Sequence, residues 1–392
     1  MPASPSTARA INDRLALRLL QQEGPLTAGQ LKQLTGLSRP TVADLVERLA
    51  AAGLIEVAGE SGEQRRGPNA KLYGIVADRA HLAALDVRTE GVSVVVSDLL
   101  GRVLAESSVP IAGDIGTGPA VEQAVALVER VAKEAGADRL HTVGIGAPGL
   151  IDPATGELRN STGLPEWHRR LVATLQERLP ETRVHVENET NLAALAEQRD
   201  GAARDRDTFV LLWLGHGTGA AVVLDGALRR GASGGTGEIG FLPVPGTHGL
   251  PSATGCEGGF HSLAGSAAIA ELAGEHGVVA EAAEYEPVAA ALVRAAVAST
   301  ATAFLNTLAD RLAVGVSSVV AVLDPGCVVL GGEVGQAGGE ELAARVEERV
   351  RRMSPLPTKV RSSELGGTAV LRGALLTARD RAQDDLFSPP ER

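Results

Sequence analysis

The sequence predicts an α/β protein in which a small winged helix-turn-helix precedes a larger body of alternating strands and helices. In the first part, two short amphipathic segments flank the turn Thr35-Gly36-Leu37, and two short apolar runs then flank a polar loop. In the second part, apolar β-rich runs alternate with helical stretches. We expect a first domain over residues 1–78, a body over residues 79–385 and a disordered tail over residues 386–392.

The composition indicates a cytoplasmic protein with a large aliphatic core. The chain has 392 residues, of which 44% are hydrophobic and only 2% aromatic, so Ala, Val and Leu must build the core. No run of about 18 apolar residues predicts a membrane span. The N-terminus has no apolar segment of an export signal, and Cys256 and Cys327 are the only cysteines. We expect a reduced protein without disulfides.

The charge is unevenly distributed along the chain. The net charge is −11, which by itself argues against a nucleic-acid-binding protein. Residues 1–78, however, hold nine Lys or Arg and eight Asp or Glu, so the acidic charge lies in the body. The first domain alone can therefore bind DNA, with few phosphate contacts, and a dimer would be needed for useful affinity.

The helices of the first domain are predicted from their caps and apolar faces. Thr27 can cap a short helix with Leu31 and Leu34 facing inward, and Ser38 can cap a second helix with Pro40 in its first turn. The second helix has an apolar face of Val42, Leu45, Val46 and Leu49. The preceding segment, residues 8–22, carries a broad stripe of Ile11, Leu15, Leu17, Leu19 and Leu20.

This arrangement favours DNA binding through the second helix and the loop. The N-terminal part of such a helix enters the major groove, and here Ser38, Arg39, Thr41 and Asp44 point outward. Arg65 and Arg66 lie at the tip of the loop SGEQRRGPNA, where they suit backbone or minor-groove contacts. The alternative is a helical module for protein–protein contact with a solvated charged loop.

Glycine loops after strands predict a ligand cleft in the body. They are Gly144–Gly149, Gly215–Gly219 and Gly331-Gly332. The first strands form a three-stranded meander, and SVVAVLDPGCVVLGGEV is a further apolar β-rich run. Helices are expected over Gly118–Ala135, Trp167–Leu179 and Glu286–Leu308, the last serving core or dimer contacts.

With these parts in order, the chain resembles the ROK family of repressors and sugar kinases. The segments that carry the resemblance are VGIGAPGLIDPATGELRNSTGLPEW, VHVENETNLAALAE, LGHGTGAAVVLDGALRRGASGGTGEIG and VLDPGCVVLGGEV. The resemblance implies a two-lobed, actin-like (ribonuclease H-like) sugar kinase body behind the winged head of the repressor branch. Its first lobe would span about residues 79–190 and 366–385, and its second lobe about residues 191–365.

Two replacements argue against kinase activity. The kinases of the family hold ATP phosphates with an Asp-x-Gly-Gly-Thr loop, and the equivalent stretch LDVRTEG has Arg88 where a glycine should stand. They place an Asp base where this chain has Glu189. The extra methylene moves the carboxylate by roughly 1 Å, and an error of that size can cost about 100-fold in rate. We expect no catalytic residues and no cofactor, with an active ATP-dependent sugar kinase as the alternative.

The zinc ligands of the family are replaced as well. Phe241 stands at the histidine position, and Ser252, Thr254 and Gly259 stand at the cysteine positions. A structural zinc needs about four N or S ligands, so we expect no metal and a loop held by glycine turns and by packing of Phe241. A rearranged site made from His248, Cys256 and His261 is the alternative.

The resemblance also implies a sugar pocket with altered side chains. Glu238 is retained, and His261 stands where the family binds sugar with a glutamate. The residues that we expect to face the effector are Asn188, Glu189, Glu238 and His261, a set suited to a polyol. Two interpretations stay open: a changed effector (a sugar, sugar phosphate or glycoside) or a ligand-independent regulator with a vestigial pocket. The expected protein is a repressor of carbohydrate-related genes that binds a double-stranded operator as a homodimer or homotetramer.

Overall fold

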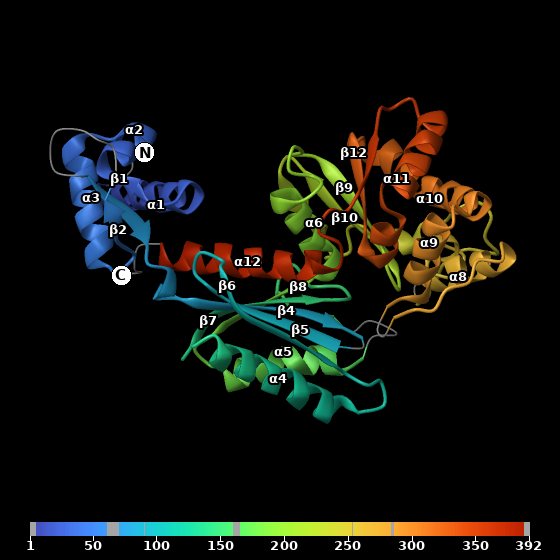
Figure 1. The fold of residues 1–392 in the computed structure, drawn as a ribbon, viewed down its shortest axis with the longest axis horizontal. Coiled ribbons are helices and arrows are strands. Elements are labelled where there is room, and N and C mark those ends of the chain that lie inside the picture. The colour runs from blue at the N-terminus through green and yellow to red at the C-terminus, as the bar shows by residue number, and fades with distance from the viewer. Residues whose placement is uncertain are drawn as a thin grey trace.

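Three sheets organise the chain, one in a head and one in each of two lobes (Figure 1). The computed structural model describes residues 5–60, 70–89, 91–159, 165–252, 254–283 and 286–387. We call the part from α1 to β3 the head. The first lobe is the sheet β6-β5-β4-β7-β8 with its helices, and the second lobe is the sheet β11-β10-β9-β12-β13 with its helices.

The head is a winged helix-turn-helix whose helices begin at the predicted caps. It contains α1 (Pro5–Glu23), α2 (Ala28–Thr35), α3 (Arg39–Ala51) and the antiparallel strands β1 (Leu26–Thr27), β2 (Ile55–Glu60) and β3 (Lys71–Ile75). Thr27 and Gln30 form a capping box at α2, and the Ser38 side chain accepts a hydrogen bond from Thr41 N at α3. Gly36 ends α2 in the left-handed conformation, with φ of 70°, which favours glycine.

The apolar face of α3 is buried as predicted, but two other predictions for the head were wrong. Leu34 is 51% exposed, because α2 is only eight residues long and Leu31 is its buried side chain. Ile11 and Leu15 on α1 are 58% and 39% exposed. The covered side of α1 is the one that carries Leu17 and Leu20.

The first lobe is a mixed sheet between two layers of helices. The strands β4 (His81–Arg88), β5 (Gly91–Asp98) and β6 (Val103–Pro110) form the predicted antiparallel meander, and β7 (Leu140–Ala147) and β8 (Arg183–Asn188) continue the sheet in parallel. A short 3-10 helix, η1 (Ala77–Arg79), precedes β4. The helices α4 (Thr117–Glu134) and α5 (Trp167–Arg178) cover one face, and α12 (Ala369–Leu386) covers the other (Figure 1).

The second lobe has a five-stranded sheet and a thicker helical layer. Its strands are β9 (Phe209–Leu214), β10 (Thr218–Leu224), β11 (Ala227–Arg229), β12 (Cys327–Gly331) and β13 (Lys359–Ser362). Its helices are α7 (His261–Ala264), α8 (Ser266–Glu275), α9 (Val288–Ala298), α10 (Thr302–Leu323) and α11 (Gly332–Met353). The helix α6 (Glu189–Asp200) packs along α12 and against β10, so it joins the two lobes.

Two secondary-structure predictions for this lobe were wrong. The helix expected over residues 286–308 is two helices, α9 and α10, separated by a turn in which Thr300 has a φ of 54°. The run SVVAVL belongs to the end of α10 and is not a strand. A short apolar run does not distinguish a buried helix from a buried strand, and here the tertiary packing made it helical.

The helix α10 is, within the described residues, the one that is long and apolar enough to cross a membrane. Its residues Leu305, Leu308 and Leu312 are fully buried in the core of the second lobe. This packing makes α10 a core helix.

The helix α12 connects the head to the body. Gln383 Nε2, near its C-terminus, donates to Gln21 Oε1 of α1 (2.8 Å) and to Leu99 O of the first lobe (3.1 Å). Arg14 of α1 forms an ion pair with Asp384. Leu20 and Phe387 belong to one apolar cluster that spans head and body. The head is therefore joined to the first lobe by both polar and apolar contacts.

Candidate DNA-binding face and effector cleft

The predicted DNA-contacting residues of α3 lie at its N-terminus. Ser38, Arg39 and Asp44 are exposed, and Thr41 is half-buried. The hydroxyls of Ser38 and Thr41 lie 2.7 Å apart within the cap. The Arg39 side chain is exposed directly after the cap residue Ser38.

Asp44 has a structural role that the sequence did not reveal. Its carboxylate forms an ion pair with Arg48 one turn along α3. Arg48 also binds Asp13 of α1 (2.5 Å), and this hydrogen bond raises the pKa of the Arg48 guanidinium. This network links α3 to α1 and so orients the helix that carries Arg39.

The wing arginines Arg65 and Arg66 lie outside the described residues. The strands that lead to them are paired as expected, from Ile55 opposite Ile75 to Glu60 opposite Lys71. A β-bulge between Val57 and Gly59 shifts the register of this hairpin.

Between the two lobes, Arg88 is the centre of an ion cluster. At the end of β4, its Nε donates to Asp86 Oδ2 (2.9 Å) in the same lobe. Its Nη1 donates to Glu333 Oε1 (2.5 Å), on the first turn of α11 in the second lobe. The resemblance to the ROK kinases identified Arg88 as the residue that replaces a glycine of their phosphate loop. It gave no sign of the partner Glu333, which directly follows the glycine pair Gly331-Gly332.

Glu189 lies close enough to this cluster to be perturbed by it. Desolvation raises the pKa of Glu189 to about 8, helped by the negative charges of Asp86 and Glu333 and opposed by Arg88. Burial likewise raises the pKa of Asp86. At neutral pH Glu189 is therefore mostly a protonated acid, a poor form for a general base.

Asn188 ties together loops and helix. Its Oδ1 accepts from Thr190 N (2.9 Å) and Asn191 N (3.3 Å), capping α6, and its Nδ2 donates to Gly149 O (2.9 Å). The adjacent Glu187 is buried and forms an ion pair with Arg230 of the second lobe (2.7 Å). This is a second ion pair between the lobes. The sequence did not predict it, because a single arginine in a glycine-rich loop belongs to no recognisable motif.

Glu238 and His261 come from the second lobe. Desolvation raises the pKa of the Glu238 carboxyl. His261 Nδ1 lies 3.5 Å from Thr218 Oγ1, and desolvation and the nearby His216 lower the pKa of the imidazole. The loop before Glu238 approaches the first lobe so closely that a Cβ at Gly234 would lie 2.0 Å from Ile151 O. Ile151 belongs to the same loop as Gly149, which accepts the hydrogen bond of Asn188, so the loop before Glu238 lies against the loop that Asn188 holds.

The residues of the alternative metal site are not brought together. Within the described residues, no group of three or more His, Cys, Asp or Glu side chains could hold a metal ion, and His248, Cys256 and His261 form no such group. The expected packing of Phe241 was wrong, since its side chain is 39% exposed. Phe260 is the fully buried aromatic of this loop, and its ring fills the space where a side chain at Gly315 would stand.

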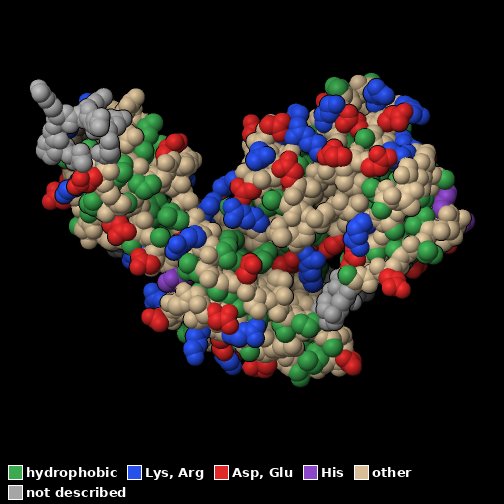
Figure 2. Space-filling view, viewed as in Figure 1, with side chains coloured by type: hydrophobic (Ala, Val, Ile, Leu, Met, Phe, Trp, Pro, Cys, Tyr) green, Lys and Arg blue, Asp and Glu red, His purple; other side chains and the backbone are tan. Residues whose placement is uncertain are grey.

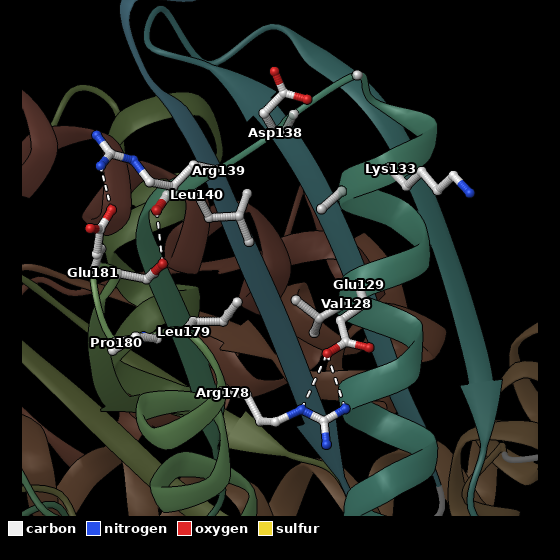
Figure 3. A pocket seen from close by; sticks show the side chains of 14 residues that line it. Val128, Glu129, Lys133, Asp138, Arg139, Leu140, Arg178, Leu179, Pro180 and Glu181 are labelled. Atoms are coloured by element: carbon white, nitrogen blue, oxygen red, sulfur yellow. Dashed lines mark hydrogen bonds and ion pairs between the residues drawn. The ribbon is translucent and has the colours of Figure 1, made fainter.

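A groove of about 500 Å³ lies elsewhere, on the first lobe (Figure 3). It is formed by the C-terminal ends of α4 and α5, which cover the face of the sheet opposite α12. The ion pairs Arg178–Glu129 (3.1 Å) and Arg139–Glu181 (2.5 Å) cross its rim. Asn188, Glu189, Glu238 and His261 are not among its lining residues.

Comparison with known proteins assigns the body to a family. The model of the ROK family matches residues 83–381. The chain belongs to the ROK family. A model of the MarR family matches residues 11–67, which agrees with the winged helix of the head.

Individual ROK relatives include both repressors and kinases. The chain is 22% identical to the xylose repressor of Caldicellulosiruptor bescii over 396 residues, which covers 98% of each chain. A ROK family transcriptional regulator, described as a homolog of the E. coli MLC protein, has the same fold, with a TM-score of 0.76 at 22% identity over 97% of this chain and 98% of that one. The ROK hexokinase from Thermus thermophilus is 30% identical, with a TM-score of 0.62, over 78% of this chain and 99% of the hexokinase. The hexokinase resembles the body, whereas the repressor and the regulator match the chain over its full length.

Proposed function

We propose that this ROK protein is a DNA-binding transcriptional repressor of carbohydrate-related genes, controlled by a sugar-like effector in the cleft. The observation that carries the proposal is the capped helix-turn-helix, with Arg39 exposed at the start of α3, joined to a ROK body. The full-length similarity to a xylose repressor supports it. Residues 1–78 are the proposed DNA-binding unit, and a symmetric dimer would bind half-sites about one or two helical turns apart.

Kinase activity is not part of the proposal. Arg88, held by Asp86 and Glu333, occupies the loop in which ROK kinases hold phosphates. Glu189, with a pKa of about 8, is mostly protonated at neutral pH, so most molecules lack a free carboxylate to accept a proton. Steady ATP turnover with any hexose by the purified protein would contradict this part of the proposal.

Two arginines of the body are already paired with carboxylates. Figure 2 shows Lys and Arg side chains gathered in the hollow between the head and the second lobe. On the helices α6 and α12, Arg199 pairs with Asp380 (2.8 Å) and Arg372 with Asp200 (2.6 Å). These guanidiniums are already neutralised by carboxylates, which favours the head as the main site of DNA binding.

The first test is fluorescence anisotropy on DNA from upstream of the protein's own gene, at near-physiological salt, with a scrambled duplex as control. We expect tight, sequence-preferring binding. A panel of free sugars, sugar phosphates and glycosides is then added to the complex. Release of DNA by one class identifies the effector, and no response to the panel supports the ligand-independent alternative. Equal affinity for both duplexes contradicts the proposal.

Substitutions in the head separate base contacts from backbone contacts. Arg39→Ala should weaken binding and relax sequence preference, by about 1–3 kcal/mol for a lost bidentate base contact. Arg65→Ala with Arg66→Ala should weaken binding to all sequences and lower the salt dependence. Unchanged affinity of the double variant at every salt concentration removes the wing from the proposal.

A substitution in the cleft tests the proposed effector contact. Glu238→Ala should abolish the response to the active sugar and leave DNA binding intact. The variant Glu257→Ala, at an exposed glutamate of the segment between η2 (Ile239–Phe241) and α7 and outside the proposed set, is the matched control. A normal sugar response in Glu238→Ala means that Glu238 does not contact the effector.

A further inference from the structure

The two lobes are held together across the cleft by Arg88. The Asp86 side chain, 5% exposed, binds the guanidinium from the first lobe, and the Glu333 side chain, 19% exposed, binds it from the second lobe. A Cβ on Gly215 would lie 2.7 Å from Glu333 Oε2, so the carboxylate is also packed against the glycine loop after β9. The cluster thus lies against two glycine loops of the second lobe, the loop after β9 and the loop after β12.

Arg88 also contacts the segment through which the chain returns to the first lobe. Its Nη2 donates to Gly367 O (3.2 Å) in the 3-10 helix η3 (Gly366–Thr368). Gly366 has a φ of 52°, and Gly367 N donates to Gln336 Oε1 of α11 (3.1 Å). The segment before η3 is fixed by the buried carboxylate of Glu197, which accepts from Leu365 N (3.0 Å). A movement of α11 relative to β4 must therefore strain or displace η3.

From η3 the movement can reach the head through one element. α12 begins directly after η3 at Ala369 and ends at Leu386, beside the head (Figure 1). Its 18 residues correspond to about 27 Å of helix. At its far end Gln383 binds Gln21, and Asp384 binds Arg14 of α1. Both ends of α12 are thus bonded, one to the cleft and one to the head.

We propose that Arg88 and Glu333 form an intramolecular latch that takes the place of nucleotide phosphates between the lobes, and that η3 and α12 couple this latch to the head. The latch keeps this end of the cleft closed without nucleotide. Opening of the lobes then requires the Arg88–Glu333 contact to break, and the position of the head changes with it. The coupling to DNA affinity rests on the proposed repressor function, whereas the latch itself rests on the cleft geometry alone.

The latch is tested by the distance between the lobes. Spin labels are attached to cysteines introduced at two exposed positions, Lys133→Cys on α4 and Arg351→Cys on α11. The full-length protein also carries Cys256→Ser, which removes the partly exposed native cysteine. Double electron–electron resonance then measures the distance between the two labels. We expect one narrow distribution for the parent and a broader or longer one for Arg88→Gln and for Glu333→Gln. The double variant should resemble the single variants, because each removes the same contact. The control Arg178→Gln, which breaks an ion pair within the first lobe (Figure 3), should leave the distribution unchanged.

Two results overturn the proposal at different points. Glu333→Gln is the milder substitution, because Arg88 keeps its ion pair with Asp86. An unchanged distance distribution in this variant refutes the latch. If α12 couples the latch to the head, the variants should change the affinity for the upstream DNA by about five-fold or more. A changed distance distribution with unaltered DNA affinity refutes this coupling. If the parent protein binds no DNA, the repressor function fails while the distance measurement still decides the latch.

Discussion

At the scale of single residues, a few replacements change the chemistry of the cleft. Arg88 introduces a cation that draws Asp86 and Glu333 toward it. For Glu189, the neighbour of these carboxylates, burial and the charges of Asp86 and Glu333 outweigh the charge of Arg88 and raise its pKa to about 8. The same position that would hold an ionised base in a kinase here favours the neutral acid.

This shift predicts a pH dependence of stability. The folded state holds the Glu189 proton up to about pH 8, whereas the unfolded chain releases it near pH 4.5. The stabilisation is therefore fully present below the unfolded pKa and is lost as the pH rises toward 8, on the order of 1 kcal/mol per pH unit. Glu189→Gln should remove this loss. Urea unfolding at pH 5, 6.5 and 8 measures it, with the exposed Glu341→Gln as control. An equal pH dependence in Glu189→Gln and the parent contradicts the assigned pKa.

At the scale of elements, short polar caps decide where the head's helices begin. The capping box at Thr27 and the cap at Ser38 satisfy N–H groups that α2 and α3 leave unpaired. Ser38 orients Arg39, which follows it directly, and the ion pairs of Arg48 with Asp13 and Asp44 secure the same helix further along. The N-terminal end of α3, where we propose DNA contact, is therefore ordered by its own sequence and by α1.

The cap of α3 predicts a graded effect of substitution. Ser38→Ala should destabilise the head by about 1 kcal/mol, whereas Ser38→Gly should cost only a few tenths. Native-state hydrogen exchange of the α3 amides measures this difference without DNA. The assignment of Ser38 as the cap is wrong if alanine protects these amides as well as serine does.

At the scale of the whole molecule, the joint between head and body is partly apolar. Phe387, 6% exposed, shares a cluster with Leu20 of α1 and Leu99 of the first lobe. The polar contacts of Gln383 and Asp384 lie beside it. The apolar cluster supplies the attachment, because exposed ion pairs contribute little to stability.

Loss of this cluster should release the head from the body. Phe387→Ala should weaken the packing of the head on the body by about 3–5 kcal/mol. The released head should increase the radius of gyration, which small-angle X-ray scattering measures. Phe241→Ala, at an aromatic residue that is 39% exposed, is the matched control and should leave the radius unchanged. A compact Phe387→Ala protein means that the polar contacts alone hold the head.

The sequence by itself determined the architecture of head and body. Caps at Thr27 and Ser38, the glycine turn at Gly36 and the apolar face of α3 are local signals, and each has the predicted role. The motifs of the body identified the ROK family, which the family model confirms. The apolar runs around α9 and α10 were less informative, because composition alone does not separate a buried helix from a buried strand.

Only the tertiary structure decided which polar residues meet. Arg88 and Glu333 are 245 positions apart, and Glu187 and Arg230 belong to different lobes, so no local pattern could pair them. The exposure of Leu34, Ile11 and Phe241 likewise depends on which elements cover them. Helix caps and turns depend on neighbours within a few residues, whereas ion pairs across a cleft depend on how two lobes close, and the fold alone settles that.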